Sequence, residues 1–266
     1  MGNCEPINTS NVSIETNLVS YSLESSLNES ISENDDSTIF SEQSENLHEE
    51  ALLNPSDVLK NIHMKNANRL VLAQININSI RNKFESLIET ISDRIYILLI
   101  SETKIDSSFP NAQFNIPGYA TYRRDRNLYG GGLMLYVKDD LPSKLLKIEV
   151  DSESFYIEIN VRKKKWLIGC TYNPNVNLIS SHLEKVGRNL DNYLPTYDNF
   201  LLLGDLNAEP SNQFVKDFCQ VYSCSNILNE KTCFKNPLNP TCIDLTITNR
   251  PRSFQSSAVN RVVRLS

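Results

Sequence analysis

Carboxylate and amide side chains follow the apolar runs of this sequence where buried strands would end. A rigid sheet holds side chains at the ends of its strands in fixed positions, and reactive groups are commonly found there. Carboxylates and amides in such positions can hold a hard cation, orient water or move a proton. The residues concerned are Asn76, Glu102, Asp205, Asn207 and Asp244.

Each of these residues, taken alone, is compatible with a purely structural role. Asn76 could begin a turn, Glu102 could lie in a solvated loop, and Asp244 could be an isolated charge at a sheet edge. Residues 204–207 could be a plain turn after a strand. The functional interpretation therefore depends on all five residues together and on their order.

The elements that would position these residues follow from hydrophobic periodicity. Strands are predicted over 70–76, 95–100, 119–124, 133–138, 145–150, 155–161, 166–172, 200–203 and 243–247. Helices are predicted over 81–92, 179–194 and 214–222, and the Arg-Lys-Lys-Lys run at 162–165 falls at a hairpin tip. A strand–helix–strand start and an antiparallel middle predict a layered α/β fold with mixed sheets.

The first 50 residues differ in composition from the rest. They contain eleven acidic side chains and no Lys or Arg, and the whole chain is −6, so residues 51–266 carry +5. They are rich in Ser, Asn and Glu and hold no sustained period. We predict a disordered acidic arm over 1–50, a linker or short helix over 51–68, and one domain over 69–266. The mildly basic body permits a polyanionic substrate.

No segment indicates export or membrane insertion. The sequence has neither an apolar run of ~18 residues nor a secretory signal. No two of its six cysteines have the Cys-x-x-Cys spacing, which favours reduced cysteines over a zinc site. We therefore expect an intracellular protein, nuclear or cytoplasmic, that acts away from membranes.

Five motifs in order resemble the endonuclease/exonuclease/phosphatase superfamily, which shares the DNase I-like four-layer α/β sandwich. They are Asn-Ile-Asn-Ser-Ile at 76–80, Ser-Glu-Thr-Lys at 101–104, Thr-Tyr-Asn-Pro-Asn at 171–175, Gly-Asp-Leu-Asn at 204–207 and Cys-Ile-Asp-Leu at 242–245. The closer similarity is to the apurinic-type endonuclease domain that precedes the reverse transcriptase in non-LTR retrotransposons. Residues 73–83, 99–106 and 122–132 look like that branch, and the resemblance extends from residue 69 to residue 250.

The resemblance implies a catalytic role for each strand-end residue. Glu102 would bind Mg²⁺, or Mn²⁺ in its place, and Asn76 would orient Glu102 and help to line the metal site. Tyr172 would contact the scissile phosphate of a DNA substrate. Asp205 would activate or position the attacking water or assist the leaving oxygen, and Asn207 would orient the phosphate.

Asp244 would orient a general-base histidine, but the expected partner is missing. The family pattern ends with Ser-Asp-His on a final strand, whereas the histidines here are His48, His63 and His182. We therefore expect a truncated or frameshifted mobile-element gene, a missing final strand and an open sheet edge. Because a general base contributes ~10²–10⁴-fold, we expect little or no activity.

Basic residues supply weaker candidates for contacts with substrate phosphate. These are Arg123, Arg124 and Arg126, together with Thr241, and the lysines at 163–165 could bind phosphate or simply be solvated. No obligate protein partner is indicated. Two other interpretations stay open: a non-catalytic remnant that binds nucleic acid, and another enzyme of this fold, such as a repair endonuclease or a lipid-phosphate phosphodiesterase.

Overall fold

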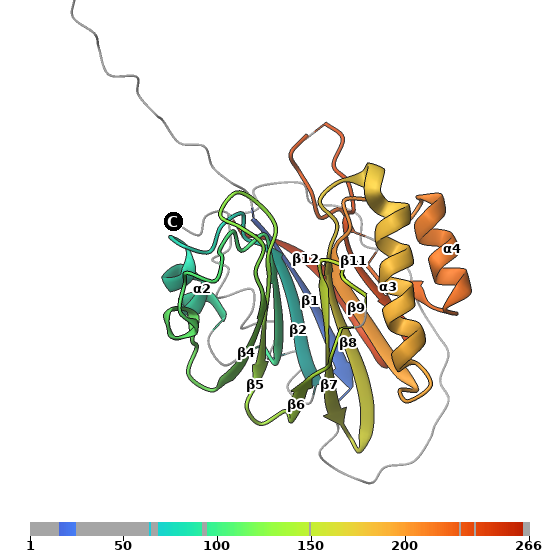
Figure 1. Cartoon of the computed structure of the whole chain (residues 1–266), viewed down its shortest axis with the longest axis horizontal. Coiled ribbons are helices and arrows are strands. Elements are labelled where there is room, and N and C mark those ends of the chain that lie inside the picture. Colours follow the sequence, from blue (N-terminus) through green and yellow to red (C-terminus); the bar gives the residue numbers. More distant parts are fainter. Residues whose placement is uncertain are drawn as a thin grey trace, which may run out of the picture.

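The computed structural model describes residues 16–24, 64, 69–91, 95–148, 150–228, 230–236 and 238–262. Two mixed sheets of six strands each pack face to face, with helices on their outer faces (Figure 1). The layers therefore run helix, sheet, sheet, helix, and the predicted layered α/β fold with mixed sheets is confirmed.

The first sheet has the strand order β12-β1-β2-β3-β5-β4. Its strands are β1 (Thr16–Glu24), β2 (Arg69–Asn76), β3 (Ile97–Ser101), β4 (Tyr119–Arg124), β5 (Leu133–Lys138) and β12 (Phe254–Val262). β2 and β3 are parallel, and the other pairs in this sheet are antiparallel.

The second sheet has the order β10-β11-β9-β8-β7-β6. Its strands are β6 (Ser143–Leu145), β7 (Ser154–Val161), β8 (Lys164–Tyr172), β9 (Asn199–Asp205), β10 (Ser225–Asn226) and β11 (Asp244–Thr248). β8 and β9 are its parallel pair. Each sheet thus contains one parallel pair, and the site residues follow those two pairs.

Helices cover both outer faces. α2 (Phe84–Ile91) lies against the first sheet, and α3 (Ile179–Tyr193) and α4 (Gln213–Val221) lie against the second (Figure 1). Three short 3-10 helices complete the described elements: η1 (Asn111–Phe114), η2 (Val176–Leu178) and η3 (Pro251–Ser253). None of the helices in the described ranges has the length and apolar character needed to cross a membrane.

β2 shows why the strands around the site read as continuous apolar runs. Leu70 and Leu72 point into the core between the sheets, whereas Val71, Ala73 and Ile75 point into a second core that includes α2. Both faces of the strand are therefore buried, so the alternation of a half-exposed strand is absent. A strand buried on both faces is a stiff support for the residues at its end.

Most predicted elements match the structure to within a few residues, and one does not. The strand predicted over 145–150 is instead β6, which ends at Leu145. Leu146 and Ile148 pack against the core from an irregular segment, so their burial does not depend on strand pairing. The predicted helix over 81–92 begins later, at Phe84. The linker or short helix predicted over 51–68 lies outside the described residues, apart from Met64.

The N-terminal arm predicted to be disordered contributes a strand. Thr16–Glu24 forms β1, which pairs antiparallel with β2 on one side and with β12 on the other. Residues 16–24 therefore differ from the predicted disorder. The alternation Val-Ser-Tyr-Ser-Leu at 19–23 suits a strand, but its pairing partners are distant in sequence and leave no local signal. The remainder of residues 1–50 lies outside the described ranges.

β1 lies between β2 and β12, so β2 is not an edge strand. β12 pairs with β1 along its length. The edge strands of the first sheet are therefore β12 and β4. Absence of the family's final strand stays a prediction.

Candidate active site

Strand register brings the predicted residues to one end of the sandwich. Asn76 ends β2, Glu102 directly follows β3, and the two parallel strands end side by side. In the second sheet, Tyr172 at the end of β8 pairs with Asp205 at the end of β9. Asp244, the first residue of the antiparallel β11, lies directly opposite Asp205. Five strand ends therefore deliver five side chains to one place.

The Asn76 amide links the two sheets at this place. Its Nδ2 donates to Oε1 of Glu102 at 3.0 Å and to Oδ2 of Asp205 at 3.0 Å. Its Oδ1 accepts the backbone N–H of Asn78 at 3.2 Å. Asn76 thus holds one carboxylate from each sheet by hydrogen bonds. The metal-lining role predicted for Asn76 stays a prediction, since the amide presents its NH₂ group to the carboxylates.

Tyr172 and Asn207 complete the hydrogen-bonded group. The Tyr172 hydroxyl donates to Oε1 of Glu102 at 3.3 Å, and burial together with the Glu102 charge raises the pKa of the phenol. The Asn207 N–H donates to Oδ1 of Asp205 at 2.9 Å, and its Nδ2 donates to the carbonyl oxygen of Asn173 at 2.7 Å. Both side chains are held in place and neutral at physiological pH.

The carboxylates differ in their preference for a proton. Burial raises the pKa of Glu102, but the Asn76 hydrogen bond and the nearby Lys104 ammonium outweigh burial and leave that pKa below its ordinary value. Lys104 Nζ lies 3.3 Å from Oε2 of Glu102. Glu102 is therefore ionised over the physiological range.

Asp205 and Asp244 have the opposite tendency. Burial, together with the charge of Glu102, raises the pKa of Asp205 from 3.8 to about 6. Burial and the facing Asp205 carboxylate raise the pKa of Asp244 well above its ordinary value. Like charges opposite one another on neighbouring strands repel, and such separation of carboxyl pKa values is typical of acid–base sites.

The backbone around Glu102 is strained and tightly supported. Glu102 has φ 54° and Lys104 has φ 52°, in the left-handed region that non-glycine residues seldom adopt. Gly132, at φ 87°, accepts the N–H of Thr103 through its carbonyl, and a Cβ on Gly132 would lie 2.3 Å from Thr103 Oγ1. The glycine run at 130–132 thus permits close approach to the loop that presents Glu102.

The donor set fits a divalent metal ion that is held by few protein ligands. Among the described residues, no group of three His, Cys, Asp or Glu side chains is arranged to hold a metal ion. Mg²⁺ is commonly bound by one or two carboxylates, with waters and substrate phosphate supplying its other ligands. An ionised Glu102 beside two aspartates that resist ionisation fits that pattern, because a bound cation would relieve the repulsion among the three carboxyl groups.

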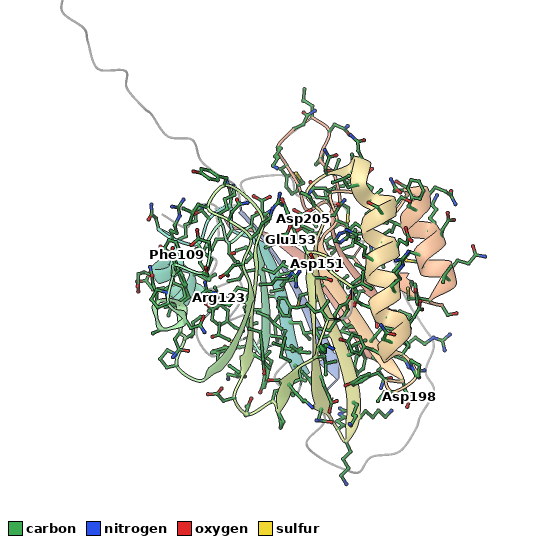
Figure 2. The ribbon with its side chains drawn as sticks, in the orientation of Figure 1. Phe109, Arg123, Asp151, Glu153, Asp198 and Asp205 are labelled. Atoms are coloured by element: carbon green, nitrogen blue, oxygen red, sulfur yellow. The ribbon has the colours of Figure 1, made fainter. Side chains whose placement is uncertain are left out.

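The arginines predicted to contact phosphate differ in how many of their N–H groups are already hydrogen-bonded within the protein. All five N–H donors of Arg123 are used: Nε and one terminal nitrogen bind Asp125, and the others bind the Phe109 and Asp106 carbonyls and Asn111. Figure 2 places Arg123 and Phe109 together beside the first sheet. The phosphate contact predicted for Arg123 is thus incompatible with this arrangement, in which the guanidinium fixes a loop.

Arg124, Arg126 and Thr241 lie nearer the site end. Arg124 pairs with Asp151, whose side chain is 94% exposed, and Arg126 Nη1 lies 3.2 Å from Oε2 of Glu153. Asp151 and Glu153 appear at the same end of the sandwich as Asp205 (Figure 2). Thr241 lines a groove of about 470 Å³ together with Asn207 and Lys235. Their contacts with phosphate remain predictions.

His182 does not complete the site. Its Nε2 lies 2.7 Å from Thr171 Oγ1, and burial lowers its pKa to about 4, so the ring is neutral. Thr171 and Tyr172 are successive residues of β8 and point to opposite faces of the sheet. His182 therefore lies on the α3 side, and His48 and His63 fall outside the described residues.

Sequence reasoning missed three contributors. Lys104 is the last residue of the Ser-Glu-Thr-Lys motif, and its spacing from Glu102 is the signal that could indicate their ion pair. Lys235 exerts its charge on Glu102, Asp205 and Asp244 from a loop that no periodicity identifies. Asn173 holds Asn207 and donates to the Leu206 carbonyl at 2.8 Å.

The family assignment follows from a sequence match. The model of the endonuclease/exonuclease/phosphatase family matches residues 73–265, and the chain belongs to that family. Members of the family are hydrolytic nucleases or phosphatases. No curated protein sequence matches the chain.

Solved structures share the fold at low sequence identity. The human Nocturnin catalytic domain is 15% identical, with a TM-score of 0.53, over 67% of this chain and 81% of that one. An AP endonuclease from Archaeoglobus fulgidus is 17% identical, with a TM-score of 0.53, over 68% and 87%. The endonuclease domain of TRAS1, a telomere-specific non-LTR retrotransposon, is 16% identical, with a TM-score of 0.51, over 66% and 83%. The chain therefore has the DNase I-like α/β fold.

Proposed function

We propose that this chain is a retroelement-type endonuclease domain whose site hydrolyses DNA phosphodiester bonds with Mg²⁺. The observation that carries the proposal is that the Asn76 amide joins Glu102 of one sheet to Asp205 of the other, in a chain that belongs to a family of hydrolytic enzymes. Fold similarity to an AP endonuclease and to a retrotransposon endonuclease domain supports DNA as the substrate.

The residues divide the work according to their protonation. Glu102, ionised, would hold Mg²⁺, which when bound supplies Lewis-acid stabilisation of charge on the phosphoryl oxygens. Asp205 titrates near 6, so it can accept a proton from water or return one to the leaving oxygen within the physiological range. Asn207 and Tyr172 offer N–H and O–H donors to phosphate oxygens.

Asp244 limits the activity that we expect, because it lacks a histidine partner among the described residues. Its carboxyl is buried beside Asp205, and its backbone N–H donates to Thr232 Oγ1 at 3.0 Å. Of the histidines, the one within the described residues is bonded elsewhere, to Thr171. If no imidazole reaches Asp244, cleavage by this chain is ~10²–10⁴-fold below that of a complete site.

Plasmid nicking tests the function. Supercoiled DNA is incubated with the purified chain in Mg²⁺, Mn²⁺ or EDTA, beside Glu102→Ala and the control Asp140→Asn, an exposed carboxylate on the β5–β6 connection. We expect slow metal-dependent nicking that Glu102→Ala abolishes and Asp140→Asn leaves intact. Absence of metal-dependent nicking at any enzyme concentration would refute catalysis by this chain and favour a nucleic-acid-binding remnant. Faster cleavage of abasic duplex or of phosphoinositides than of plain DNA would favour the other enzymes of the fold.

Adding imidazole distinguishes a chain that lacks only its general base from a chain whose site is impaired in another way. We expect imidazole in solution to accelerate nicking by the unmodified chain, because it can occupy the position that Asp244 would orient. The same addition should not accelerate Asp244→Asn. Robust nicking that is insensitive to imidazole and abolished by Glu102→Ala would show that the chain needs no further base.

A further inference from the structure

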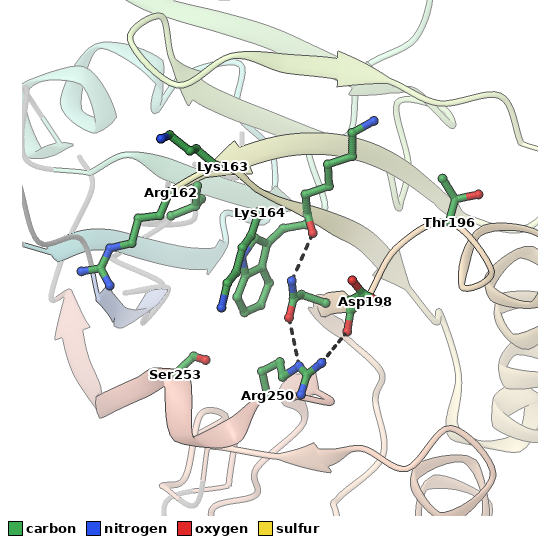
Figure 3. Close-up of a pocket in the computed structure, with 11 residues that line it drawn as sticks. Arg162, Lys163, Lys164, Thr196, Asp198, Arg250 and Ser253 are labelled. Atoms are coloured by element: carbon green, nitrogen blue, oxygen red, sulfur yellow. Dashed lines mark hydrogen bonds between the residues drawn. The ribbon is translucent and has the colours of Figure 1, made fainter.

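A basic pocket of about 720 Å³ lies at the other end of the sandwich from the carboxylates. It lies between the β7–β8 hairpin tip, the segment before β9 and the connection from β11 to β12 (Figure 3). Trp166, in its wall, is six residues along β8 from Tyr172, or ~20 Å at ~3.3 Å per residue. Asp198 and Asp205 mark the two ends in Figure 2.

Positive side chains dominate the lining of this basic pocket. Against the carboxylate of Asp198 it has five cations, namely Arg162, Lys163, Lys164, Lys165 and Arg250. Lys165 pairs with Glu158 at 3.3 Å, which offsets part of the positive charge. A concave surface with such an excess of one charge concentrates polyanions.

Arg250 is held in position by neutral acceptors. Its Nε donates to Oδ1 of Asn199 at 2.9 Å, and one terminal nitrogen donates to the Asp198 carbonyl oxygen at 3.3 Å (Figure 3). Asn199 in turn donates to the Lys165 carbonyl oxygen at 3.3 Å. These bonds fix the planar guanidinium without cancelling its charge, and a fixed guanidinium is suited to a phosphate.

The hairpin tip places cations where turn geometry alone would favour other residues. Arg162 and Lys163 have φ 51° and 60°, so they form a two-residue turn in the left-handed region. Asn and Gly are the residues that such a turn prefers. The chain has Arg and Lys there instead, followed by Lys164, which extends toward the side of the pocket that holds Arg250 and Ser253 (Figure 3).

We propose that the basic pocket binds the phosphodiester backbone of a polynucleotide, as a second nucleic-acid site separate from the carboxylate cluster. Its cations come from separate chain segments, the β7–β8 hairpin and the connection from β11 to β12. Its apolar members, Trp166 and Val161, are only 4% and 7% exposed. The pocket thus offers no apolar side chain for insertion into a lipid surface, which favours a polynucleotide over a membrane.

The distance gives the second site a distinct role. A double helix bound at the carboxylate cluster would lie across the ends of β2, β3, β8 and β9. That end of the sandwich is the one away from the basic pocket. The basic pocket therefore holds a different strand or a different stretch of nucleic acid while the first site is occupied. It works independently of metal and of Glu102.

Charge reversal at Lys164 tests the proposal. Affinity of the full chain for a labelled 20-nucleotide single strand is measured by fluorescence anisotropy in EDTA, over a series of salt concentrations. Lys164→Glu is compared with Lys216→Glu, which makes the same charge change on the exposed face of α4. Arg250→Gln and Arg250→Lys test the guanidinium, and EDTA keeps the first site free of metal. Thermal unfolding shows that each variant is folded.

We expect Lys164→Glu and Arg250→Gln to weaken binding roughly tenfold, as removal of a charge-assisted phosphate hydrogen bond does. The slope of log affinity against log salt should fall by ~0.7 for each phosphate of the single strand that the variant no longer neutralises. Lys216→Glu should stay within twofold of the unmodified chain, and Arg250→Lys should lie between the unmodified chain and Arg250→Gln.

Three outcomes would overturn the proposal. Equal weakening by Lys164→Glu and Lys216→Glu would show that a diffuse field attracts the strand. Millimolar inorganic phosphate that competes as well as the oligonucleotide would favour a free anion as the ligand. Anionic vesicles that bind through Lys164 would favour a membrane.

Discussion

Replacing Asp205 with asparagine should stabilise the fold while impairing catalysis. The Asp205 side chain is buried, and its pKa is raised from 3.8 to about 6. At ~1.4 kcal/mol for each tenfold change in a protonation equilibrium, that rise corresponds to ~3 kcal/mol of unfavourable free energy in the ionised folded state. Asparagine removes this charge and also relieves the repulsion on the facing Asp244.

Part of this gain is offset by hydrogen bonding. Asn207 N–H can donate to the new Oδ1 as it does to the carboxylate. The new Nδ2 would face the Asn76 amide, a donor against a donor, where Oδ2 accepts now. An unsatisfied buried donor costs ~1–2 kcal/mol. The net gain is ~1–2 kcal/mol at pH 8, or a rise in Tm of ~2–8 °C for a domain of this size.

The stability gained by Asp205→Asn should depend on pH in a definite direction. Between about pH 4 and pH 6 the unfolded chain has released the Asp205 proton while the folded chain retains it, so the contribution of Asp205 to stability is lost as pH rises. The advantage of Asp205→Asn should therefore be largest at pH 8 and should shrink toward pH 4.

Thermal unfolding followed by circular dichroism at pH 4.5, 6 and 8 measures this difference. Asp140→Asn, with the same chemical change at an exposed position, is the control and should show no pH-dependent gain. An Asp205→Asn variant that unfolds at a lower temperature than the unmodified chain at pH 8 would refute the reasoning. So would a gain that is the same at every pH.

Two further substitutions test the architecture around the site. Gly204→Ala should cost about 3 kcal/mol or more, because its Cβ would lie 1.9 Å from the Thr171 carbonyl oxygen between two parallel strands; a change below about 1 kcal/mol in denaturant unfolding would contradict this. Arg123→Ala should cost about 2–3 kcal/mol, because it removes five hydrogen bonds and leaves the partly buried Asp125 carboxylate without its ion-pair partner. Arg124→Ala, at an exposed ion pair, should cost only about 0–1 kcal/mol. Equal destabilisation by the two arginine variants would show that the five hydrogen bonds of Arg123 contribute less to stability than expected.

The fold near the site could be predicted because its strands are local features. Tyr119–Arg124 and Leu133–Lys138 match their predicted bounds, since the first is rich in Tyr and Thr, which favour strands, and the second is almost wholly apolar. The meeting of Glu102 and Asp205 could also be expected from their places at strand ends. Both expectations follow from local hydrophobic patterns and from the order of the motifs, without knowledge of contacts between residues distant in sequence.

Other features depend on contacts that no local pattern encodes. The five bonds of Arg123 involve four separate residues, so a basic residue that looked free in the sequence is committed in the fold. The register of β1 with β2 depends on which strand edge remains available. The pocket around Arg250 is assembled from segments on either side of β9, and the sequence showed only its lysine run.

The position of β1 also sets the order in which the first sheet can form. β1 can pair with β2 as soon as both have been synthesised, but Thr16 pairs on its other side with Val262, 246 residues further along the chain. At about 5–20 residues per second, synthesis of the intervening chain takes ~12–50 s. During that time the outer edge of β1 has no native partner and can pair with another strand. Formation of this edge is expected to be a late folding step, and slow because its contacts are so distant in sequence.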